Sequence, residues 1–321
     1  MNILITSIGS FSAKATIESI RKNFNAYIYG CNSTQAEWIY TSTLIDKFYC
    51  IPSSEKQTLY MESILSICTL HNIELLIPLT DAEIDILNKH RNYFESLGVI
   101  LCMPSQNTIE HSRDKYKVYE FFKSDDFVKT INSFELTDIH ISKTIFPLIA
   151  KPKTGRSSQG IVKINNPSEF ELYLKCIEQN NVFVQEFITG DIWVADVVRQ
   201  SSNEETVVVT RKELTRTING AGITVEINQN IDIISSTKKI VDKLNLNGCI
   251  NIEFIVSPKG IYLMDINPRF SAGVAFSNIS GYDMVKNHLL CFMGMNIDKK
   301  TSFKKCIATR HYEETIMSDI Q

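Results

Sequence analysis

The sequence lacks several features that would each assign a protein to a particular class. Its 321 residues include only 13 glycines and 8 prolines, fewer than a fibrous or disordered chain needs. It has no run of about 18 apolar residues, so no membrane-spanning helix is expected. Residues 1–10 lead directly into a predicted strand without a basic leader, and we therefore expect a cytoplasmic protein.

A surplus of positive charge is also missing. The chain has 33 Lys and Arg residues against 36 Asp and Glu residues, which gives a formal net charge of -3. Affinity for nucleic acid depends largely on clustered basic residues that neutralise the phosphate backbone. We therefore expect small-molecule partners, with neither nucleic acid nor a membrane among them.

Metal-site spacings of cysteine and histidine are absent. The eight cysteines are scattered, mostly within apolar segments, and form no CxxC pair that would indicate zinc binding or dithiol chemistry. None of the six histidines has a His or Cys partner at metal-site spacing. Buried free thiols are therefore expected.

What residues 1–104 do contain is a regular alternation of short apolar segments and helix-period segments. The apolar segments 2–5, 26–29, 75–79 and 99–103 are predicted strands, and Ala13, Ile17 and Ile20 recur at helical spacing between two of them. This alternation is typical of a parallel sheet covered by helices. We predict a small doubly wound α/β domain over residues 1–104.

The turn after the first strand does not fit a dinucleotide site. A dinucleotide fingerprint requires three spaced glycines at this place, and residues 6–10 contain only Gly9. A nicotinamide cofactor is therefore not expected. Ser10 remains a candidate substrate contact, with an ordinary tight turn as the alternative.

Strands predominate in the second part of the sequence. A helix is predicted over 114–123 and a strand over 146–151. Further strands are predicted at 161–164, 182–187, 192–198, 206–211, 249–256 and 261–266, and helices at 168–179, 232–244 and 282–292. Many strands joined by short turns, with few helices, indicate an α+β arrangement.

A lysine followed by a loop of small residues is the first candidate site. Lys151 ends an apolar strand, and the loop between Gly155 and Gly160 includes Ser157 and Ser158. The backbone N–H groups of such a loop are suited to close over phosphates, and Lys151 would supply a fixed positive charge. A hairpin loop after an exposed lysine is an equally frequent structural explanation.

Oxygen donors near the end of the sequence form the second candidate site. Asp265 and Asn267 point to the same face of a predicted strand, and Glu253 on the neighbouring strand is placed to join them. Oxygen ligands of this kind suit Mg²⁺, and Arg269 offers a planar donor fork for a phosphoryl or acyl-phosphate oxygen. A carboxylate pair at a strand end is the alternative, although acidic residues within apolar strands cost free energy unless they are paired or metal-bound.

In their order along the chain these motifs resemble the ATP-grasp superfamily, near its carbamoyl-phosphate-synthase-like and amino-acid-ligase branches. The resemblance covers the whole chain and rests on the Asp114-Lys115 element, on Lys151 with its loop, on residues 184–190 (VQEFITG) and on residues 265–269 (DINPR). It implies a pre-ATP-grasp domain over 1–104, a small lobe with a flap over 105–190, and a C-terminal lobe with the metal site over 191–321.

The resemblance also implies roles for individual residues. Lys115 and Lys151 would contact the ATP phosphates and the adenine edge, and Arg269, Lys151 and Asn267 would act at the reacting phosphoryl group. Metal binding would fall to Glu253, Asp265 and Asn267, with Mg²⁺ as the ion and Mn²⁺ as an alternative. The remaining nucleotide contacts would come from the flap and the hinge strand, namely Ser157, Ser158, Gly160, Gln185, Glu186, Phe187 and Ile188.

Two positions depart from the family's pattern. Ile192 stands where a glutamate commonly holds the ATP ribose, and Asp191 is expected to substitute for it. Asp265 replaces the more usual glutamate, so its shorter side chain would draw the ion closer to the strand or admit a water.

The substrate end of the site is predicted from a basic segment and a glycine. Arg211, Arg216 and Gly222 lie in a region that flanks the acceptor carboxylate in similar ligases, with a solvated basic loop as the alternative. Asp81 and Glu83 follow a buried strand, where they are placed to contact substrate or to cap the next helix, and capping is favoured for Asp81.

The expected function is that of an ATP-dependent ligase that joins a carboxylate to an amine, or to a thiol, through an acyl phosphate. One alternative is a carboxyphosphate- or carbamate-forming kinase of the synthetase type, and another is a non-catalytic nucleotide-binding sensor with the same fold. We find no Ser/His or Cys/His constellation, in agreement with a reaction that needs no covalent enzyme nucleophile. A homodimer is left open.

Overall fold

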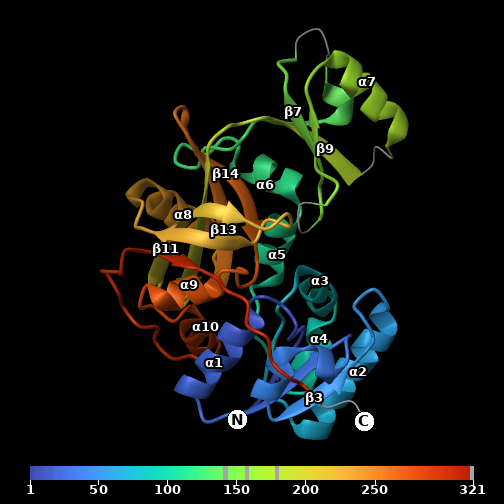
Figure 1. Cartoon of the computed structure of the whole chain (residues 1–321), viewed down its shortest axis with the longest axis vertical. Helices are drawn as coiled ribbons and strands as arrows, with labels where there is room; N and C mark the ends of the chain where they lie inside the picture. The colour runs from blue at the N-terminus through green and yellow to red at the C-terminus, as the bar shows by residue number, and fades with distance from the viewer. Residues whose placement is uncertain (140–143, 156–158, 178–180, 319–321) are drawn as a thin grey trace.

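The computed structural model describes residues 1–139, 144–155, 159–177 and 181–318 (Figure 1). Within these residues the strands form three sheets, one in the N-terminal part of the chain and two in the remainder. The N-terminal sheet lies at the bottom of Figure 1, a small sheet with its helix lies at the top, and the largest sheet lies between them.

The N-terminal sheet is parallel throughout. Its order is β3-β2-β1-β4-β5. The strands are β1 (Asn2–Ile5), β2 (Tyr27–Asn32), β3 (Lys47–Cys50), β4 (Leu75–Ile77) and β5 (Ile100–Leu101), and the helices are α1 (Ala13–Asn23), α2 (Gln57–His71), α3 (Asp81–Lys89) and α4 (Arg91–Ser96). Short 3-10 helices cover Ala36–Trp38 and Tyr40–Leu44. The predicted doubly wound domain is confirmed. Its edge strand β3 was not predicted, and its residues are at most half-buried.

The small sheet is antiparallel, in the order β6-β9-β7-β8. It consists of β6 (Ser133–Glu135), β7 (Leu148–Pro152), β8 (Val162–Ile164) and β9 (Val182–Glu186), packed against α7 (Pro167–Cys176), with a 3-10 helix at Leu136–Asp138. Leu148, Ala150, Phe170 and Val184 belong to a core that this lobe does not share with the other sheets. The lobe therefore stands apart at the top of Figure 1.

The largest sheet has the antiparallel order β14-β13-β10-β11-β12-β15. Its strands are β10 (Asp191–Arg199), β11 (Thr206–Arg216), β12 (Gly222–Ile227), β13 (Gly248–Ser257), β14 (Gly260–Asn267) and β15 (Cys306–Thr309), and its helices are α8 (Ile231–Lys243), α9 (Val274–Ile279) and α10 (Met284–Phe292). The α+β prediction is confirmed. β12 and β15 were not predicted, because they contain only 6 and 4 residues and are only partly buried.

Two helices connect the N-terminal sheet to the rest of the chain. Ser105 caps α5 (Gln106–Arg113), and Asp114 caps α6 (Lys115–Phe122) by accepting the N–H groups of Tyr116 and Lys117 at 2.9 and 3.0 Å. The cap fixes the start of α6, and with it the position of Lys115.

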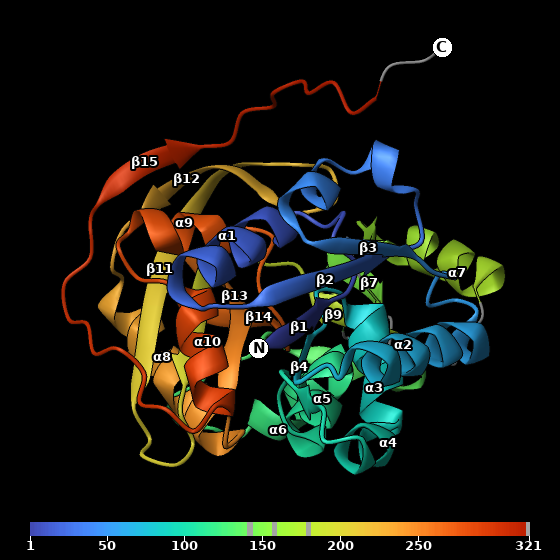
Figure 2. The same cartoon turned by 90° about the horizontal axis from the view of Figure 1, so that it is seen from below.

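The N-terminal domain and the largest sheet share one apolar core. Ile3 and Ile17 belong to the same buried cluster as Val198, Phe270 and Leu289. Figure 2 shows α1 beside α10, where the Ser19 hydroxyl donates to Asp283 at 2.7 Å. These two parts are therefore packed as one unit. None of the helices in the described residues is long and apolar enough to cross a membrane. The domain limits at residues 104 and 190 stay a prediction.

Candidate functional site

A cavity of about 460 Å³ collects most of the predicted site residues. Its walls come from α6, β7, the strands β10 to β14 and the loop after β1. Among the described residues that line it are five basic side chains, Lys115, Lys151, Arg211, Arg216 and Arg269, against three carboxylates, Glu213, Glu253 and Asp265. An excess of fixed positive charge in a concave site favours an anionic ligand.

The register of β13 and β14 brings the predicted metal ligands together. Glu253 lies directly opposite Asp265, and Asn251 lies opposite Asn267. Because directly opposed residues of an antiparallel pair point to the same face, all four side chains share one face of the sheet. The predicted same-face placement of the three candidate ligands is thus present, and Asn251 adds a fourth oxygen donor.

Each of the two carboxylates is paired with a basic side chain. Lys115 Nζ lies 2.7 Å from Asp265 Oδ2, and Arg216 Nη2 lies 2.8 Å from Glu253 Oε2. The Asn267 amide donates to Asn251 Oδ1 at 2.9 Å. The donor set suits a hard divalent cation, although only two members are carboxylates. In the described part of the chain no group of three or more His, Cys, Asp or Glu side chains is placed to hold a metal.

Lys151 is buried, which excludes the exposed lysine of the alternative hairpin explanation. Its side chain is 6% exposed, and its Nζ lies 5.3 Å from the centre of the Phe183 ring on β9. Burial lowers the pKa of Lys151 to about 8, with Asp265 opposing the shift and Lys115 adding to it. A bound anion would raise this pKa again, because it stabilises the charged form.

Arg211 is fixed inside a buried ionic cluster. Its guanidinium donates to Asp196 at 2.7 Å, to Glu213 at 3.2 Å and to Ser271 at 3.1 Å, and it is 2% exposed. Burial lowers the pKa of Arg211, but the two carboxylates outweigh this effect and the net pKa is raised. The alternative of a solvated basic loop is therefore wrong for Arg211, which is buried and lines the cavity.

Glu213 and Arg216 follow on the same strand and border the same cavity. Two register irregularities between β11 and β12 lie at Glu213, Thr215 and Arg216. Gly222 leaves the room that Glu213 uses, because a Cβ atom there would come 2.2 Å from Glu213 Oε2. This carboxylate oxygen is buried without a hydrogen-bond partner, and Arg216 Nε lies 3.8 Å away. Burial raises the pKa of Glu213, with Arg211 and Arg216 opposing the shift.

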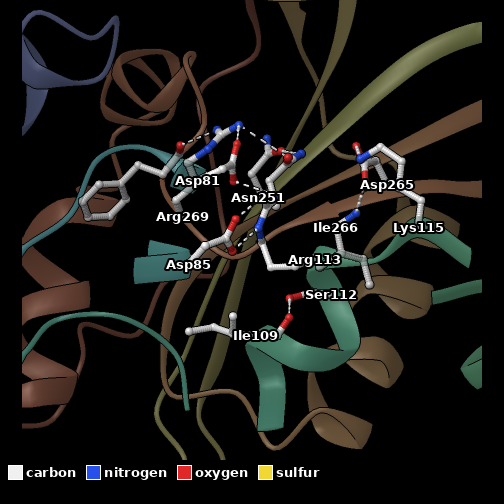
Figure 3. A network of polar contacts seen from close by, with 12 residues as sticks. Asp81, Asp85, Ile109, Ser112, Arg113, Lys115, Asn251, Asp265, Ile266 and Arg269 are labelled. Carbon is white, nitrogen blue, oxygen red and sulfur yellow. Dashed lines mark hydrogen bonds and ion pairs between the residues drawn. The ribbon is translucent and has the colours of Figure 1, made fainter. Parts of the chain in front are cut away.

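Arg269 is held from the N-terminal domain. Its Nη2 donates to Asp81 Oδ2 at 2.8 Å, and Arg113 lies on the other side of Asp81, with its Nη1 3.5 Å from Oδ1 (Figure 3). Capping was the favoured role for Asp81, but the residue before it, Thr80, is the N-cap of α3, and the Asp81 carboxylate binds the two arginines instead. Glu83 is buried and accepts from Thr80 Oγ1 at 2.8 Å.

The predicted flap and hinge lie at the small lobe. Gly160 has φ +72° and lies against Pro152, so a residue with a side chain would be strained at this position. Ser157 and Ser158 lie outside the described residues. In the hinge, Gln185 Nε2 donates to Ser133 at 2.9 Å and Glu186 accepts from Asn132 at 3.0 Å.

Neither Phe187 nor Ile188 borders the main cavity. The Phe187 N–H donates to the Pro147 carbonyl at 3.2 Å, and the Phe187 ring packs under Lys163. Ile188 packs against Ile255 and Tyr262. Adenine binding by the hinge stays a prediction, and the Phe187 N–H would have to exchange its present partner.

Two predicted contacts are corrected by the structure. Asp191 lies on the face of β10 opposite to Val194, which lines the cavity, and forms an ion pair with Lys212 at 2.7 Å. It is therefore not placed to replace the ribose-binding glutamate. Ser10 borders a separate, open depression with Gly9, and the residue of this loop that reaches the main cavity is Phe11.

Several site residues were not predicted from the sequence. Asn251 stands two residues before the predicted Glu253 and so repeats the spacing of Asp265 and Asn267, a signal that was present in the sequence. Asp196 interrupts an otherwise apolar strand, a second available signal. Phe11 carries no comparable signal.

Comparisons with known proteins agree with this geometry. The family model described as the ATP-grasp domain matches residues 112–273, just over half of the chain, and the model described as the PylC-like N-terminal domain matches residues 3–102. The chain therefore belongs to the ATP-grasp family. The prediction of an ATP-grasp ligase is confirmed as a family assignment.

Curated relatives include the carbamoyl phosphate synthase large chains of Thermoanaerobacter sp. and Caldanaerobacter subterraneus. They are 27% and 28% identical over 209 and 202 residues, which is 59% and 57% of this chain. The matches cover 19% and 18% of those proteins, so the chain spans about a fifth of the length of the curated relatives it matches.

Solved structures share the fold over nearly the whole chain. Biotin carboxylase from Campylobacter jejuni has a TM-score of 0.76 at 14% identity and covers 94% of this chain and 73% of its own. N5-carboxyaminoimidazole ribonucleotide synthetase from Thermotoga maritima has a TM-score of 0.71 at 16% identity, with coverage of 95% and 79%. At these identities the likeness establishes the fold.

Proposed function

We propose that the protein binds ATP together with Mg²⁺ and uses it to join a carboxylate to an amine, or to a thiol, through an acyl phosphate. The observation that carries this proposal is that Lys115, Lys151 and Arg269 line the same cavity as the in-register oxygen donors of β13 and β14. Basic side chains bind the phosphates of a triphosphate, and oxygen donors bind the divalent cation that accompanies it.

The nucleotide phosphates are assigned to the basic side chains at one end of the cavity. Lys115 at the start of α6 and Lys151 on β7 approach from the linking helix and the small lobe, and Gly155 of the flap lines the same space. Glu253, Asp265 and Asn267 would hold Mg²⁺ or Mn²⁺, which neutralises phosphate charge when bound. The adenine pocket of the hinge strand remains part of the proposal.

The proposed reaction has two steps. A carboxylate oxygen of the acid forms a bond to the γ-phosphorus as the bond to ADP breaks, and Arg269 donates to the phosphoryl oxygens during the transfer. The amine or thiol then attacks the acyl carbon, the bond to the phosphate oxygen breaks, and inorganic phosphate leaves. Arg216 and Gly222, with Glu213, would border the acid or its acceptor at the other end of the cavity.

A second candidate is a kinase that forms carboxyphosphate or carbamate, in which bicarbonate replaces the organic acid. It is favoured by the carbamoyl phosphate synthase relatives, and by a solved structure of similar fold described as a biotin carboxylase domain dimer in complex with MgADP and bicarbonate. Bicarbonate-dependent ADP release in carbon-dioxide-depleted buffer separates the two. A homodimer stays a prediction.

The first test is a thermal-shift assay. A ligand that binds only the native state raises stability by RT ln(1 + [L]/Kd), so Mg-ATP should raise the melting temperature and NAD should not. Protection by NAD without protection by Mg-ATP would contradict the proposal. A screen of ADP and phosphate release against pools of carboxylates and amines then identifies the substrates, and release that responds to none of them would favour the sensor alternative.

A further inference from the structure

We infer that Asp81, a residue of the N-terminal domain, positions the guanidinium of Arg269 for contact with the transferred phosphoryl group. The inference rests on the proposed function, in which Arg269 serves phosphoryl transfer. It assigns the N-terminal domain a part in the phosphoryl site itself.

The contacts of Arg269 fix the plane of its guanidinium. Nη2 donates to Asp81 Oδ2 at 2.8 Å and lies 3.4 Å from Asn267 Oδ1, while Nη1 donates to the Phe270 carbonyl at 3.1 Å. Asp81 is the only charged acceptor that these contacts give Arg269 within the described residues. Arginine has five N–H donors, so these bonds leave part of the fork for a ligand in the cavity that Arg269 lines.

Asp81 is itself held in place. It is 3% exposed in the first turn of α3, where the helix dipole favours a negative charge. Arg113 lies 3.5 Å from its second oxygen and is anchored by two 2.7 Å bonds to Asp85 (Figure 3). Burial raises the pKa of Asp81, but Arg269 and Arg113 outweigh this effect and the net pKa is lowered. The carboxylate is therefore ionised at neutral pH.

The shared core makes this contact a fixed one. Asp81 and Arg269 are 188 residues apart in the sequence, and the two parts of the chain that carry them pack into one apolar cluster. A loose interface would leave the guanidinium free to rotate, whereas a buried carboxylate on a packed helix restricts it. Orientation of a donor before the reaction is what makes it effective on a developing charge.

A purely structural role for Asp81 as an ion pair between domains is the competing explanation. Asp85 provides the matched control, because it stabilises the same network through Arg113 without contacting Arg269. A structural role predicts that loss of either carboxylate acts through stability alone. A positioning role predicts a defect at the phosphoryl position only in the Asp81 variant.

The experiment measures MgADP affinity of the full chain with and without aluminium fluoride, which mimics the transferred phosphoryl group. Wild-type protein should bind MgADP, and aluminium fluoride should tighten the binding. Asp81→Asn should keep MgADP affinity within about twofold but lose about tenfold or more of the tightening, as Arg269→Met does. Asp85→Asn should retain the tightening, and the double variant Asp81→Asn/Arg269→Met should lose no more than Arg269→Met alone.

The outcomes separate the inference from the proposed function. Full tightening in a folded Asp81→Asn variant, or an equal loss in Asp85→Asn, would overturn the positioning role. If Asp81→Asn does not fold, Asp81→Glu keeps the charge but displaces it by one methylene, and full tightening there would overturn the role as well. Wild-type protein that binds MgADP without any tightening would also overturn it, whereas failure to bind MgADP at all would contradict the proposed function.

Discussion

The ammonium group of Lys115 lies 2.7 Å from Asp265 Oδ2, so a residue assigned to phosphate and a residue assigned to the metal form an ion pair. Arg216, which is assigned to the substrate end of the cavity, pairs with Glu253, the second proposed metal carboxylate, at 2.8 Å. Both carboxylates must release their basic partners before they bind a cation. We therefore expect nucleotide and metal to bind together, because the phosphates receive the displaced ammonium group of Lys115.

This relationship predicts effects of opposite sign for Lys115→Met. Removal of the lysine frees Asp265, so affinity for Mn²⁺ without nucleotide should rise several-fold, while affinity for Mg-ATP should fall by about tenfold or more. Electron paramagnetic resonance measures the first quantity and calorimetry the second. Lys117→Met, an exposed position on the same helix, serves as the control. If the affinities for Mn²⁺ and for Mg-ATP both fall, the ion pair between Lys115 and Asp265 does not compete with metal binding.

The buried Lys151 predicts a pH-dependent nucleotide affinity. Its pKa in the free protein is lowered to about 8, so the charge is present below that pH and is lost as the pH rises through it. Affinity for ATP should therefore weaken above about pH 8, approaching a tenfold loss per pH unit. Lys151→Met should weaken ATP binding at pH 7 and remove the pH dependence of the affinity. Lys153 pairs with Glu135, and the control variant Lys153→Met should keep the pH dependence. A pH profile in Lys151→Met that matches the wild-type profile would exclude Lys151 as the titrating group.

Lys151→Met should not destabilise the fold near neutral pH. A lysine whose pKa is lowered on folding opposes folding most strongly below that pKa, and this penalty disappears as the pH rises towards the unfolded value near 10.5. Chemical denaturation at pH 7 and pH 9.5 measures this. A large loss of stability at pH 7 would show that the contact with Phe183 outweighs the cost of burying the charge.

The cluster around Arg211 predicts a large loss of stability. Arg211→Met leaves Asp196 and Glu213 buried without their cation, which typically costs about 3–5 kcal/mol. Arg216→Met should cost clearly less, since that side chain is 25% exposed. Urea denaturation of both variants gives the comparison. Equal free energies of unfolding for the two variants would contradict a structural role for Arg211 and would favour a role in ligand binding.

A side chain at position 222 should impair the substrate end of the cavity and leave the nucleotide end intact. Gly222→Ala places a methyl group 2.2 Å from Glu213 Oε2 and must displace that carboxylate. Turnover should fall by about tenfold or more while MgADP affinity stays within about twofold. Gly9→Ala, where the added atom meets Asn32 at ordinary contact distance, is the matched control. A fall in MgADP affinity as large as the fall in turnover would place Glu213 at the nucleotide instead.

The parts of the site that local periodicity controls were predictable from the sequence. The two-residue period of a strand predicted correctly that Asp265 and Asn267 lie on one face. The same period argues against Asp191 as a substitute for the ribose-binding glutamate, because β10 includes Asp191 and neighbouring residues of a strand, here Asp191 and Ile192, point to opposite faces. Contacts between distant segments were not predictable. The Asp81 and Arg269 pair depends on domain packing, and the burial of Lys151 depends on the register between β7 and β9.

The measurement that tests the central claim most directly is ATP turnover in Asp265→Asn, with the acid and amine found by the substrate screen, as a function of Mg²⁺ concentration. Wild-type protein should release ADP and phosphate only when both substrates are present. Asp265→Asn should remain folded, require more Mg²⁺ and turn over orders of magnitude more slowly, because one ligand charge is lost while the side-chain shape is kept. Near-wild-type turnover of Asp265→Asn at limiting Mg²⁺ would contradict the metal assignment and with it the proposed catalytic site.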